Sequence, residues 1–226
     1  MTSVTVGLLG CGIVGGALVE LIQERAEAIE IQTGITIQIG SVAVRSASKA
    51  RAGLDPSLLT TDARALVNDP SIDVVVEVIG GIEPARELIL DAIKAGKPVI
   101  TANKELLANC GAELYAAAAA AGVDLLFEAA AAGAIPIVRP LRESLLGEDI
   151  TRLMGIVNGT TNFILTRMSE DGADYADALA EAQRLGYAER DPTADVEGFD
   201  AGAKAAIMAS IAFGARVVAG DVYHEG

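Results

Sequence analysis

The sequence lacks tryptophan and has only one histidine and two cysteines among its 226 residues. The two cysteines, Cys11 and Cys110, form no CxxC pair and do not have the spacing of metal ligands. This cysteine usage argues against a disulfide framework. It favours a protein of the reducing cytoplasm.

Basic residues are scarce as well. The chain has 17 Lys and Arg against 31 Asp and Glu, which gives a net charge of −14. Because nucleic-acid binding needs clustered Lys and Arg to contact phosphates, this balance argues against a general nucleic-acid binder. We therefore expect no nucleic-acid partner.

No apolar run reaches the length of about 20 residues that a membrane-spanning helix needs. The two Ala-rich candidates, Ala116–Ala121 and Ala205–Ala215, are shorter and predict buried helices. The N-terminus passes from Thr2-Ser3 into an apolar segment without the basic region of a signal peptide. These features predict a cytoplasmic protein with no membrane partner.

Apolar residues make up 51% of the chain, and only 4% are aromatic, so Val, Ile, Leu and Ala must build the core. Short β-branched segments alternate with Ala- and Leu-rich segments, a pattern typical of an α/β fold with a Rossmann-like, doubly wound parallel sheet. The expected strands are Val4–Leu9, Ile35–Val44, Asp73–Ile79, Pro98–Thr101 and Asp124–Glu128. The expected helices are Val14–Ile29, Asp62–Asn68, Glu83–Ala95 and Lys104–Ala121, with Gly96 and Gly122 as C-caps of the last two.

After Pro136 the pattern changes. We expect a strand at Ile150–Val157, a helix at Asp174–Leu185, an acidic loop at Gly186–Gly198 and a long apolar helix at Gly198–Val218. The sequence therefore predicts two domains, a nucleotide-binding domain at residues 1–130 and an α+β domain at residues 131–226.

A glycine-rich motif connects the first expected strand to the first expected helix. Its residues are Gly10, Cys11, Gly12, Ile13, Val14 and Gly15, in the pattern GxGxxG. In a dinucleotide site the first Gly permits a tight turn, the second lets the backbone approach a pyrophosphate, and the third lets helix and strand pack closely. The motif alone also fits an ordinary βα turn, but its place at the first strand of an alternating chain favours dinucleotide binding.

The second expected strand ends at Val44-Arg45. Enzymes selective for NAD usually place an Asp or Glu here to bind the ribose 2′-hydroxyl. Arg45, followed by Ser46, Ser48 and Lys49, instead suits the 2′-phosphate of NADP. The alternative is a solvated basic loop, so we predict NADP(H) as the preferred cofactor with NAD(H) also possible.

Two later segments end neighbouring strands of the expected sheet. Ile79-Gly80-Gly81 closes the third strand, and Thr101-Ala102-Asn103-Lys104 closes the fourth. Because ligands of open α/β sheets bind beyond the carboxyl ends of the strands, both segments are predicted beside the cofactor. Each is also compatible with plain loop chemistry.

An acidic segment precedes the last long helix, and Asp200 and Lys204 lie four residues apart on one helix face. The simpler interpretation is a solvated helix start with a surface ion pair. However, the helix is otherwise apolar, so Lys204 has reason to face inward. Carboxylates and a lysine in one place suit a zwitterionic amino acid as the ligand.

Four segments together resemble the homoserine dehydrogenase family, in order along the chain and up to about residue 214. They are Thr101–Ala108, Phe127–Pro136, Gly155–Asn162 and Leu185–Lys204. The resemblance implies NAD(P)-dependent interconversion of L-homoserine and L-aspartate 4-semialdehyde, on the route to threonine, methionine and isoleucine. It also implies that the second domain, which would bind the substrate and carry the catalytic residues, is incomplete, because the family's catalytic region continues further. Full-length members of the family are expected to be homo-oligomers.

The resemblance also implies roles for individual residues. Lys204 would be the general acid/base on the substrate's C4 oxygen, with Asp200 orienting it. Lys104 would be a second active-site lysine that also lies beside the cofactor. Glu189 and Asp195 would bind the substrate.

Two further sets of residues are assigned in the same way. Asn158, Gly159 and Thr160 would lie at the substrate. A monovalent cation, Na⁺ or K⁺, would be bound mostly through backbone carbonyls at Glu128, Ala131, Gly133 and Ile135, although these groups fit water equally well. The alternatives to the whole assignment are another amino-acid or semialdehyde dehydrogenase and a catalytically silent NAD(P)-binding protein.

Overall fold

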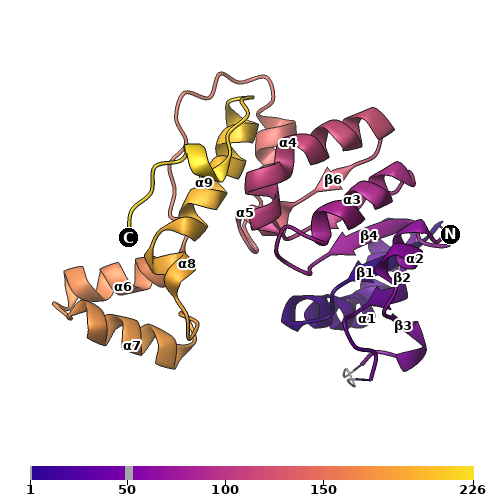
Figure 1. Cartoon of the computed structure of the whole chain (residues 1–226), viewed down its shortest axis with the longest axis horizontal. Coiled ribbons are helices and arrows are strands. Elements are labelled where there is room, and N and C mark those ends of the chain that lie inside the picture. The colour runs from indigo at the N-terminus through magenta and orange to yellow at the C-terminus, as the bar shows by residue number, and fades with distance from the viewer. Residues whose placement is uncertain (1, 49–52) are drawn as a thin grey trace. The chain divides into compact units, whose positions relative to one another are not determined.

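The computed structural model describes residues 2–48 and 53–226, so Lys49 lies outside the described residues. The chain forms two compact units, residues 1–130 and residues 131–226 (Figure 1). Among the described residues, no helix has the length and apolar character that a membrane span requires.

The first unit is built on one parallel sheet of six strands in the order β3-β2-β1-β4-β5-β6. The strands are β1 (Thr2–Leu9), β2 (Ile35–Ala43), β3 (Leu59–Thr60), β4 (Val74–Glu77), β5 (Val99–Thr101) and β6 (Leu125–Leu126). The order reverses at β1, from which the chain builds outwards first on one side and then on the other. This arrangement confirms the predicted doubly wound sheet and adds β3, a two-residue strand that the sequence pattern did not indicate.

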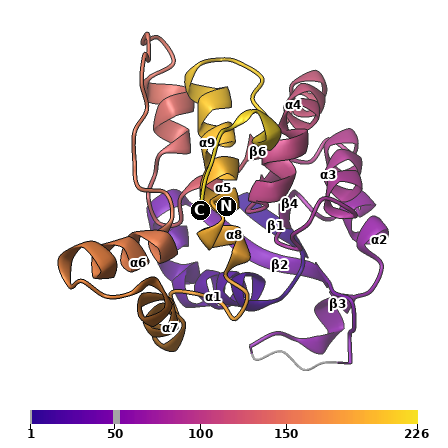
Figure 2. The same cartoon turned by 60° about the vertical axis from the view of Figure 1, so that its left-hand side comes forward.

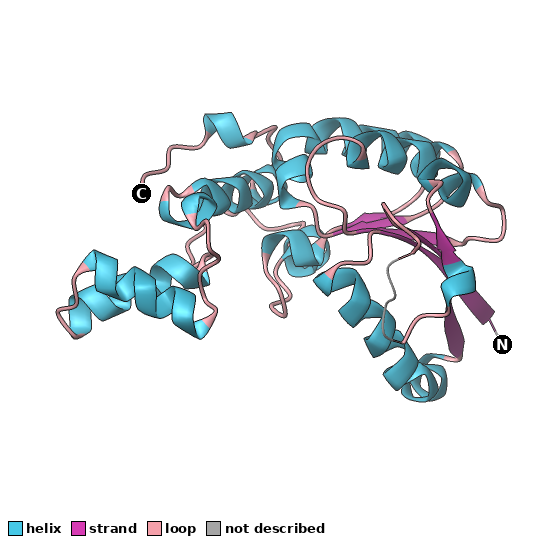
Figure 3. Cartoon of the chain, turned by 60° about the horizontal axis from the view of Figure 1, so that its bottom comes forward, coloured by secondary structure: helices cyan, strands magenta, loops and turns pink. Residues whose placement is uncertain are grey.

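Helices cover both faces of this sheet (Figure 3). They are α1 (Ile13–Thr33), α2 (Ala63–Asn68), α3 (Ala85–Lys94), α4 (Lys104–Ala121) and the short α5 (Glu128–Ala131), with a 3-10 turn, η1 (Pro56–Leu58). The helices α2, α3 and α4 lie side by side (Figure 2). Gly122 is the left-handed C-cap of α4, as predicted, and Gly96 with φ 76° follows the end of α3.

Alternation along β1 explains the two layers. Val6 and Leu8 are buried against Val19 of α1, on one face of the sheet. On the other face, a Cβ at Gly7 would lie 2.7 Å from the Leu66 side chain of α2. Because successive strand residues point to opposite faces, the apolar run of β1 serves both cores.

The last predicted strand of this unit is shorter than expected. The sequence predicts Asp124–Glu128, whereas β6 pairs only Leu125 and Leu126 with β5. After Phe127 the chain turns into α5, whose first residue is Glu128. The carboxylate at the helix start suits the positive end of the helix dipole.

All regular elements of the second unit are helices or helical turns. Its elements are η2 (Pro140–Ser144, a π-helical turn), α6 (Gly159–Glu170), α7 (Tyr175–Leu185), α8 (Thr193–Val196), α9 (Phe199–Ala212) and the 3-10 turn η3 (Ala219–Asp221). The hairpin of α6 and α7 closes over Ile164, Ala178, Ala182 and Ala188. The prediction of α7 is confirmed almost to the residue, and α8 is a short helix inside the predicted acidic loop.

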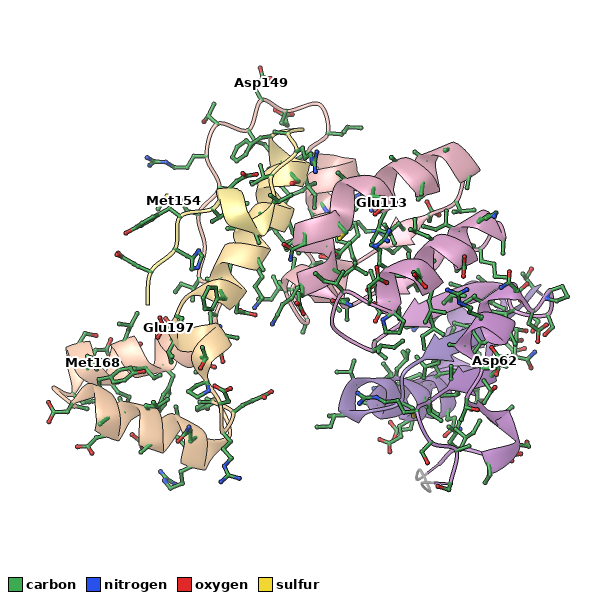
Figure 4. The ribbon with its side chains drawn as sticks, in the orientation of Figure 1. Asp62, Glu113, Asp149, Met154, Met168 and Glu197 are labelled. Atoms are coloured by element: carbon green, nitrogen blue, oxygen red, sulfur yellow. The ribbon has the colours of Figure 1, made fainter. Side chains whose placement is uncertain are left out.

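The strand predicted at Ile150–Val157 is wrong. This segment has no regular hydrogen bonding, and its apolar side chains Met154 and Ile156 are 79% and 78% exposed. The Met154 side chain projects from this loop in Figure 4. A strand needs a neighbour to satisfy its backbone groups, and no segment of residues 131–226, all of which are described, is a strand.

The helix predicted at Gly198–Val218 ends early, at Ala212. Gly214, with φ 60°, turns the chain back. The Ser210 hydroxyl then donates to the Val217 carbonyl oxygen (3.0 Å) and accepts from the Val217 N–H (3.1 Å). The Ser210 hydroxyl thereby satisfies the N–H and the carbonyl oxygen of Val217, a residue that the prediction placed inside the helix.

Candidate active site

The glycine-rich turn between β1 and α1 is built by close backbone approach. Gly10 has φ 99°, and a Cβ there would lie 2.9 Å from the Val78 carbonyl oxygen. A Cβ at Gly15, at the start of α1, would overlap the carbonyl oxygen of Gly10. At Gly12, the N-cap of α1, a Cβ would point into open space. Backbone atoms therefore pack tightly against the turn at Gly10 and Gly15, whereas the turn is open at Gly12, where a phosphate could approach the backbone.

A cavity of about 630 Å³ lies in front of this turn. Among its lining residues are six that the sequence analysis assigned to the cofactor, namely Gly10, Cys11, Gly12, Arg45, Ile79 and Gly80. The other lining residues are Ala43, Val44, Thr61, Ala63, Val78, Glu83, Pro84 and Leu88. Residues at the carboxyl ends of β1, β2 and β4 thus line one cavity, at the point where the strand order reverses.

Five other predicted cofactor residues do not line the cavity. Ile13 and Val14 are exposed on the first turn of α1, by 94% and 60%, and Gly15 is buried beneath the turn. Thr101 is buried at the end of β5, and Lys104 is exposed as the first residue of α4. Thr101 and Lys104 belong to the same carboxyl edge of the sheet, one strand further on.

Arg45 is exposed two residues beyond the end of β2, at one side of the cavity. The residues from Val44 to Ser48 include no carboxylate. The Ser46 and Ser48 hydroxyls lie 2.9 Å apart in the same loop. Arg45 therefore brings a guanidinium to this end of the cavity, and the two serine hydroxyls follow it in the same loop.

A buried carboxylate, which the sequence analysis missed, joins two of the loops at this edge. Glu77 ends β4 with no solvent exposure. Its Oε1 accepts hydrogen bonds from the backbone N–H groups of Ile79 (2.7 Å) and Gly80 (3.2 Å). Its Oε2 accepts one from the Thr101 hydroxyl (2.5 Å). A lone glutamate that ends a β-branched run, Val74-Val75-Val76-Glu77, was the available sequence signal.

The second unit brings together a different polar cluster, made of Asn158, Asp195, Asp200 and Lys204. The Lys204 Nζ lies 2.8 Å from Asp200 Oδ2 and donates to the Val157 carbonyl oxygen at 2.7 Å. Asp200 is buried, and the Lys204 side chain is 18% exposed. The pair is therefore no solvated surface ion pair, which was the simpler interpretation of the sequence.

Asn158 occupies the centre of this cluster. Its Nδ2 donates to Asp195 Oδ1 (2.7 Å) and to Asp200 Oδ2 (2.9 Å). Its Oδ1 accepts from the N–H (2.8 Å) and the hydroxyl (3.0 Å) of Thr161, so Asn158 is the N-cap of α6. An amide has two donor hydrogens and two acceptor lone pairs, so these contacts use its full capacity.

The neighbours of Asn158 lie on the same turn. Gly159 is the first residue of α6, and the buried Thr160 donates its hydroxyl to the Tyr187 carbonyl oxygen at 2.5 Å. This bond ties the start of α6 to the loop after α7. In that loop, hydrogen bonds from the hydroxyl and backbone N–H of Thr193 lower the pKa of Asp191.

Glu189 is not joined to the cluster. Its carboxylate is exposed, and its backbone carbonyl accepts a hydrogen bond from Gln183 Nε2 at 3.1 Å. Among the described residues, no hydrogen bond links the Glu189 carboxylate to Asn158, Asp200 or Lys204. Its assignment to the substrate stays a prediction.

The residues predicted to bind a cation lie along one stretch of chain. Glu128 and Ala131 begin and end α5, and Ala134, between Gly133 and Ile135, has the left-handed φ of 61°. Among the described residues, no three His, Cys, Asp or Glu side chains group as metal ligands. Because the predicted cation site depends mostly on carbonyl oxygens, this leaves the prediction untested.

The sheet is doubly wound, and its glycine-rich turn lines a cavity at the point where the strand order reverses. These features define a dinucleotide-binding domain of the Rossmann type. Residues 10–128 match the family model described as "Homoserine dehydrogenase, NAD binding domain", and residues 136–226 match the model "Homoserine dehydrogenase". The chain belongs to the homoserine dehydrogenase family.

The chain is 59% identical over 225 residues to the homoserine dehydrogenase of Corynebacterium glutamicum, covering 100% of this chain and 51% of that protein. A crystal structure of a homoserine dehydrogenase from Thiobacillus denitrificans matches with a TM-score of 0.92 and 51% identity, covering 100% of this chain and 52% of that one. A hyperthermophilic archaeal homoserine dehydrogenase in complex with NADPH matches with a TM-score of 0.82 and 32% identity, covering 95% and 71%. The chain thus spans about half the length of the curated relatives it matches.

Proposed function

We propose that this chain carries the cofactor-binding and catalytic residues of an enzyme that interconverts L-homoserine and L-aspartate 4-semialdehyde. Such an enzyme serves the synthesis of threonine, methionine and isoleucine. The observation that carries the proposal is the buried Lys204–Asp200 pair, held by Asn158, in a member of the homoserine dehydrogenase family.

The cofactor in this proposal is NADP(H), with NAD(H) as the alternative. The open face of Gly12 and the first turn of α1 suit the pyrophosphate, and Arg45 suits the 2′-phosphate of the adenosine ribose. An NADPH complex of a structural relative supports the choice. When bound, the nicotinamide accepts or donates the hydride of the reaction.

Lys204 is proposed as the general acid/base on the C4 oxygen of the substrate. Two of its three N–H donors are directed at Asp200 and at the Val157 carbonyl, which fixes the ammonium group and leaves a donor for the substrate oxygen. Asp200 orients Lys204. Lys104, at the start of α4, is proposed as the second active-site lysine, suited to the substrate carboxylate.

The remaining assignments follow the family resemblance. Glu189 and Asp195 are proposed to bind the substrate, with Glu189 at its ammonium group. Gly159 and Thr160 are proposed at the substrate through the start of α6, whose N-terminal dipole suits a carboxylate. A monovalent cation is proposed at Glu128, Ala131, Gly133 and Ile135.

The test is NADP⁺ reduction with L-homoserine, compared between the parent chain and the Lys204→Ala and Glu189→Ala variants. We expect turnover in the parent, a loss of about 10²-fold or more in Lys204→Ala, and a higher KM in Glu189→Ala. Lys94→Ala, which removes a lysine from the last turn of α3, is the matched control. A parent that is folded and binds NADPH but transfers no hydride contradicts the proposed activity.

A further inference from the structure

Glu77 is a buried anion at the edge of the sheet that forms the cofactor site. Its side chain has no solvent exposure, and it accepts three hydrogen bonds, from the N–H groups of Ile79 and Gly80 and from the Thr101 hydroxyl. Among the described residues, no lysine or arginine forms an ion pair with it. Its charge is therefore held by hydrogen bonds alone and is not cancelled by a fixed cation.

The hydrogen-bond directions show that Glu77 acts only as an acceptor. The Thr101 hydroxyl donates to Glu77 Oε2 at 2.5 Å, and its oxygen accepts the Asn103 N–H at 3.0 Å. Backbone N–H groups occupy the other carboxylate oxygen. Both carboxylate oxygens of Glu77 are therefore used as hydrogen-bond acceptors.

The sheet order indicates which part of a dinucleotide this anion faces. The pyrophosphate-binding turn follows β1, and Arg45, on the adenosine side, follows β2. Glu77 and Thr101 end β4 and β5, on the other side of β1. A dinucleotide that crosses the strand reversal therefore has its nicotinamide half at the edge formed by β4 and β5.

We propose that Glu77 determines the preference of the site for the oxidised cofactor over the reduced one. This inference rests on the proposed NADP(H) binding. The oxidised nicotinamide ring carries a positive charge and the reduced ring is neutral. A fixed negative charge behind the loop of Ile79 and Gly80 attracts the charged, oxidised ring and has little effect on the neutral, reduced ring.

The test is direct binding of NADP⁺ and of NADPH to the full chain, measured by calorimetry without substrate. Glu77→Gln keeps the size of the side chain and removes its charge. We expect the ratio of the Kd for NADP⁺ to the Kd for NADPH to rise about three- to tenfold, the effect of one partly screened unit charge. If the substitution only disorders the loop, both Kd values rise by the same factor and their ratio is unchanged.

Two variants serve as controls. Thr101→Val removes a hydrogen bond to Glu77 and keeps the charge, so both affinities should fall with the ratio constant. Asn103→Asp keeps the N-cap of α4, since its Oδ1 accepts the Leu106 N–H at 3.1 Å, and adds a second negative charge at this edge. It also removes the bond from Asn103 Nδ2 to the Gly81 carbonyl oxygen (2.6 Å), an effect common to both cofactors that leaves their ratio unchanged. Its ratio should shift in the opposite direction to that of Glu77→Gln.

The outcomes separate the two proposals. A parent that binds neither cofactor contradicts the proposed function, and the inference falls with it. A parent that binds both, with an unchanged ratio in Glu77→Gln and in Asn103→Asp, overturns the inference alone. If Glu77→Gln does not fold, as judged by circular dichroism, the ratio in Asn103→Asp decides. Absence of hydride transfer bears only on the proposed activity.

Discussion

The Lys204 ammonium lies 2.8 Å from the Asp200 carboxylate, one helical turn earlier on α9, and both groups are largely withdrawn from solvent. A second bond, to the Val157 carbonyl oxygen, comes from the segment before α6. Lys204 is thus held from two directions before any substrate is bound. Preorganised groups of this kind are what a general acid/base needs, because no reorganisation is then required during the reaction.

Asn158 supports this pair, and its replacement should be costly. Asn158→Asp exchanges the amide that donates to Asp195 and Asp200 for a third carboxylate. We expect a loss of about 1–3 kcal/mol in the free energy of unfolding and about a hundredfold loss of hydride transfer. Urea unfolding and steady-state kinetics measure these effects. Asn162→Asp, at an exposed position of the same helix, is the control and should change neither quantity appreciably.

Gly15 and Gly16 offer a matched pair on the first turns of α1. A Cβ at Gly15 would overlap the Gly10 carbonyl oxygen, whereas a Cβ at Gly16 would meet nothing within 4 Å. Gly15→Ala should destabilise the chain by about 1–3 kcal/mol and weaken NADPH binding, because the turn must open. Gly16→Ala should stabilise it by about 0.5–1 kcal/mol, since alanine favours the helix. Equal effects of the two changes would contradict the role assigned to the turn.

Arg45 should discriminate between the two cofactors. The guanidinium is proposed to bind the 2′-phosphate, which NADH lacks. In Arg45→Ala, the Kd for NADPH should rise about tenfold, with that for NADH nearly unchanged. Fluorescence titration with both cofactors gives the two constants. Arg25→Ala, on the exposed side of α1, is the control. If Arg45→Ala lowers the affinities for NADPH and NADH equally, this loop does not recognise the 2′-phosphate.

Lys97 should make stability depend on pH. It is buried, it donates to the Asp69 carbonyl oxygen, and burial lowers its pKa from the usual 10.5. The unfolded chain therefore holds this proton more tightly, so folding becomes more favourable as the pH rises through the folded-state pKa towards 10.5. The Lys97→Met variant lacks this contribution. Unfolding at about pH 7.5 and about pH 10 should show the parent gaining stability relative to the variant. The opposite trend would mean that the ammonium is stabilised in the fold.

The sequence predicted those parts of the fold that local patterns determine. The β1–α1 unit and α7 depend on β-branched runs, helix periodicity and glycine caps, all of which lie within a few residues of each other. The failed strand at Ile150–Val157 depends on a neighbouring strand, and the early end of α9 depends on the Ser210 hydroxyl reaching Val217. Neither relationship is visible in a short window of sequence.

The candidate site was predicted unevenly for the same reason. The glycine-rich turn and Arg45 were found from their places next to strands. The role of Glu77 was missed because it depends on Thr101, 24 residues later in the chain. Asn158 was found as a member of a motif, but its four hydrogen bonds to Asp195, Asp200 and Thr161 required the tertiary structure.

The most direct test of the central claim follows the hydride itself. The parent chain is incubated with NADP⁺ and L-homoserine that carries deuterium at C4, and the NADPH formed is analysed by mass spectrometry. The account predicts NADPH one mass unit heavier, formed by the parent and by Lys94→Ala and about a hundredfold more slowly, or not at all, by Lys204→Ala. Unlabelled NADPH, or equal rates in the parent and in Lys204→Ala, would contradict it.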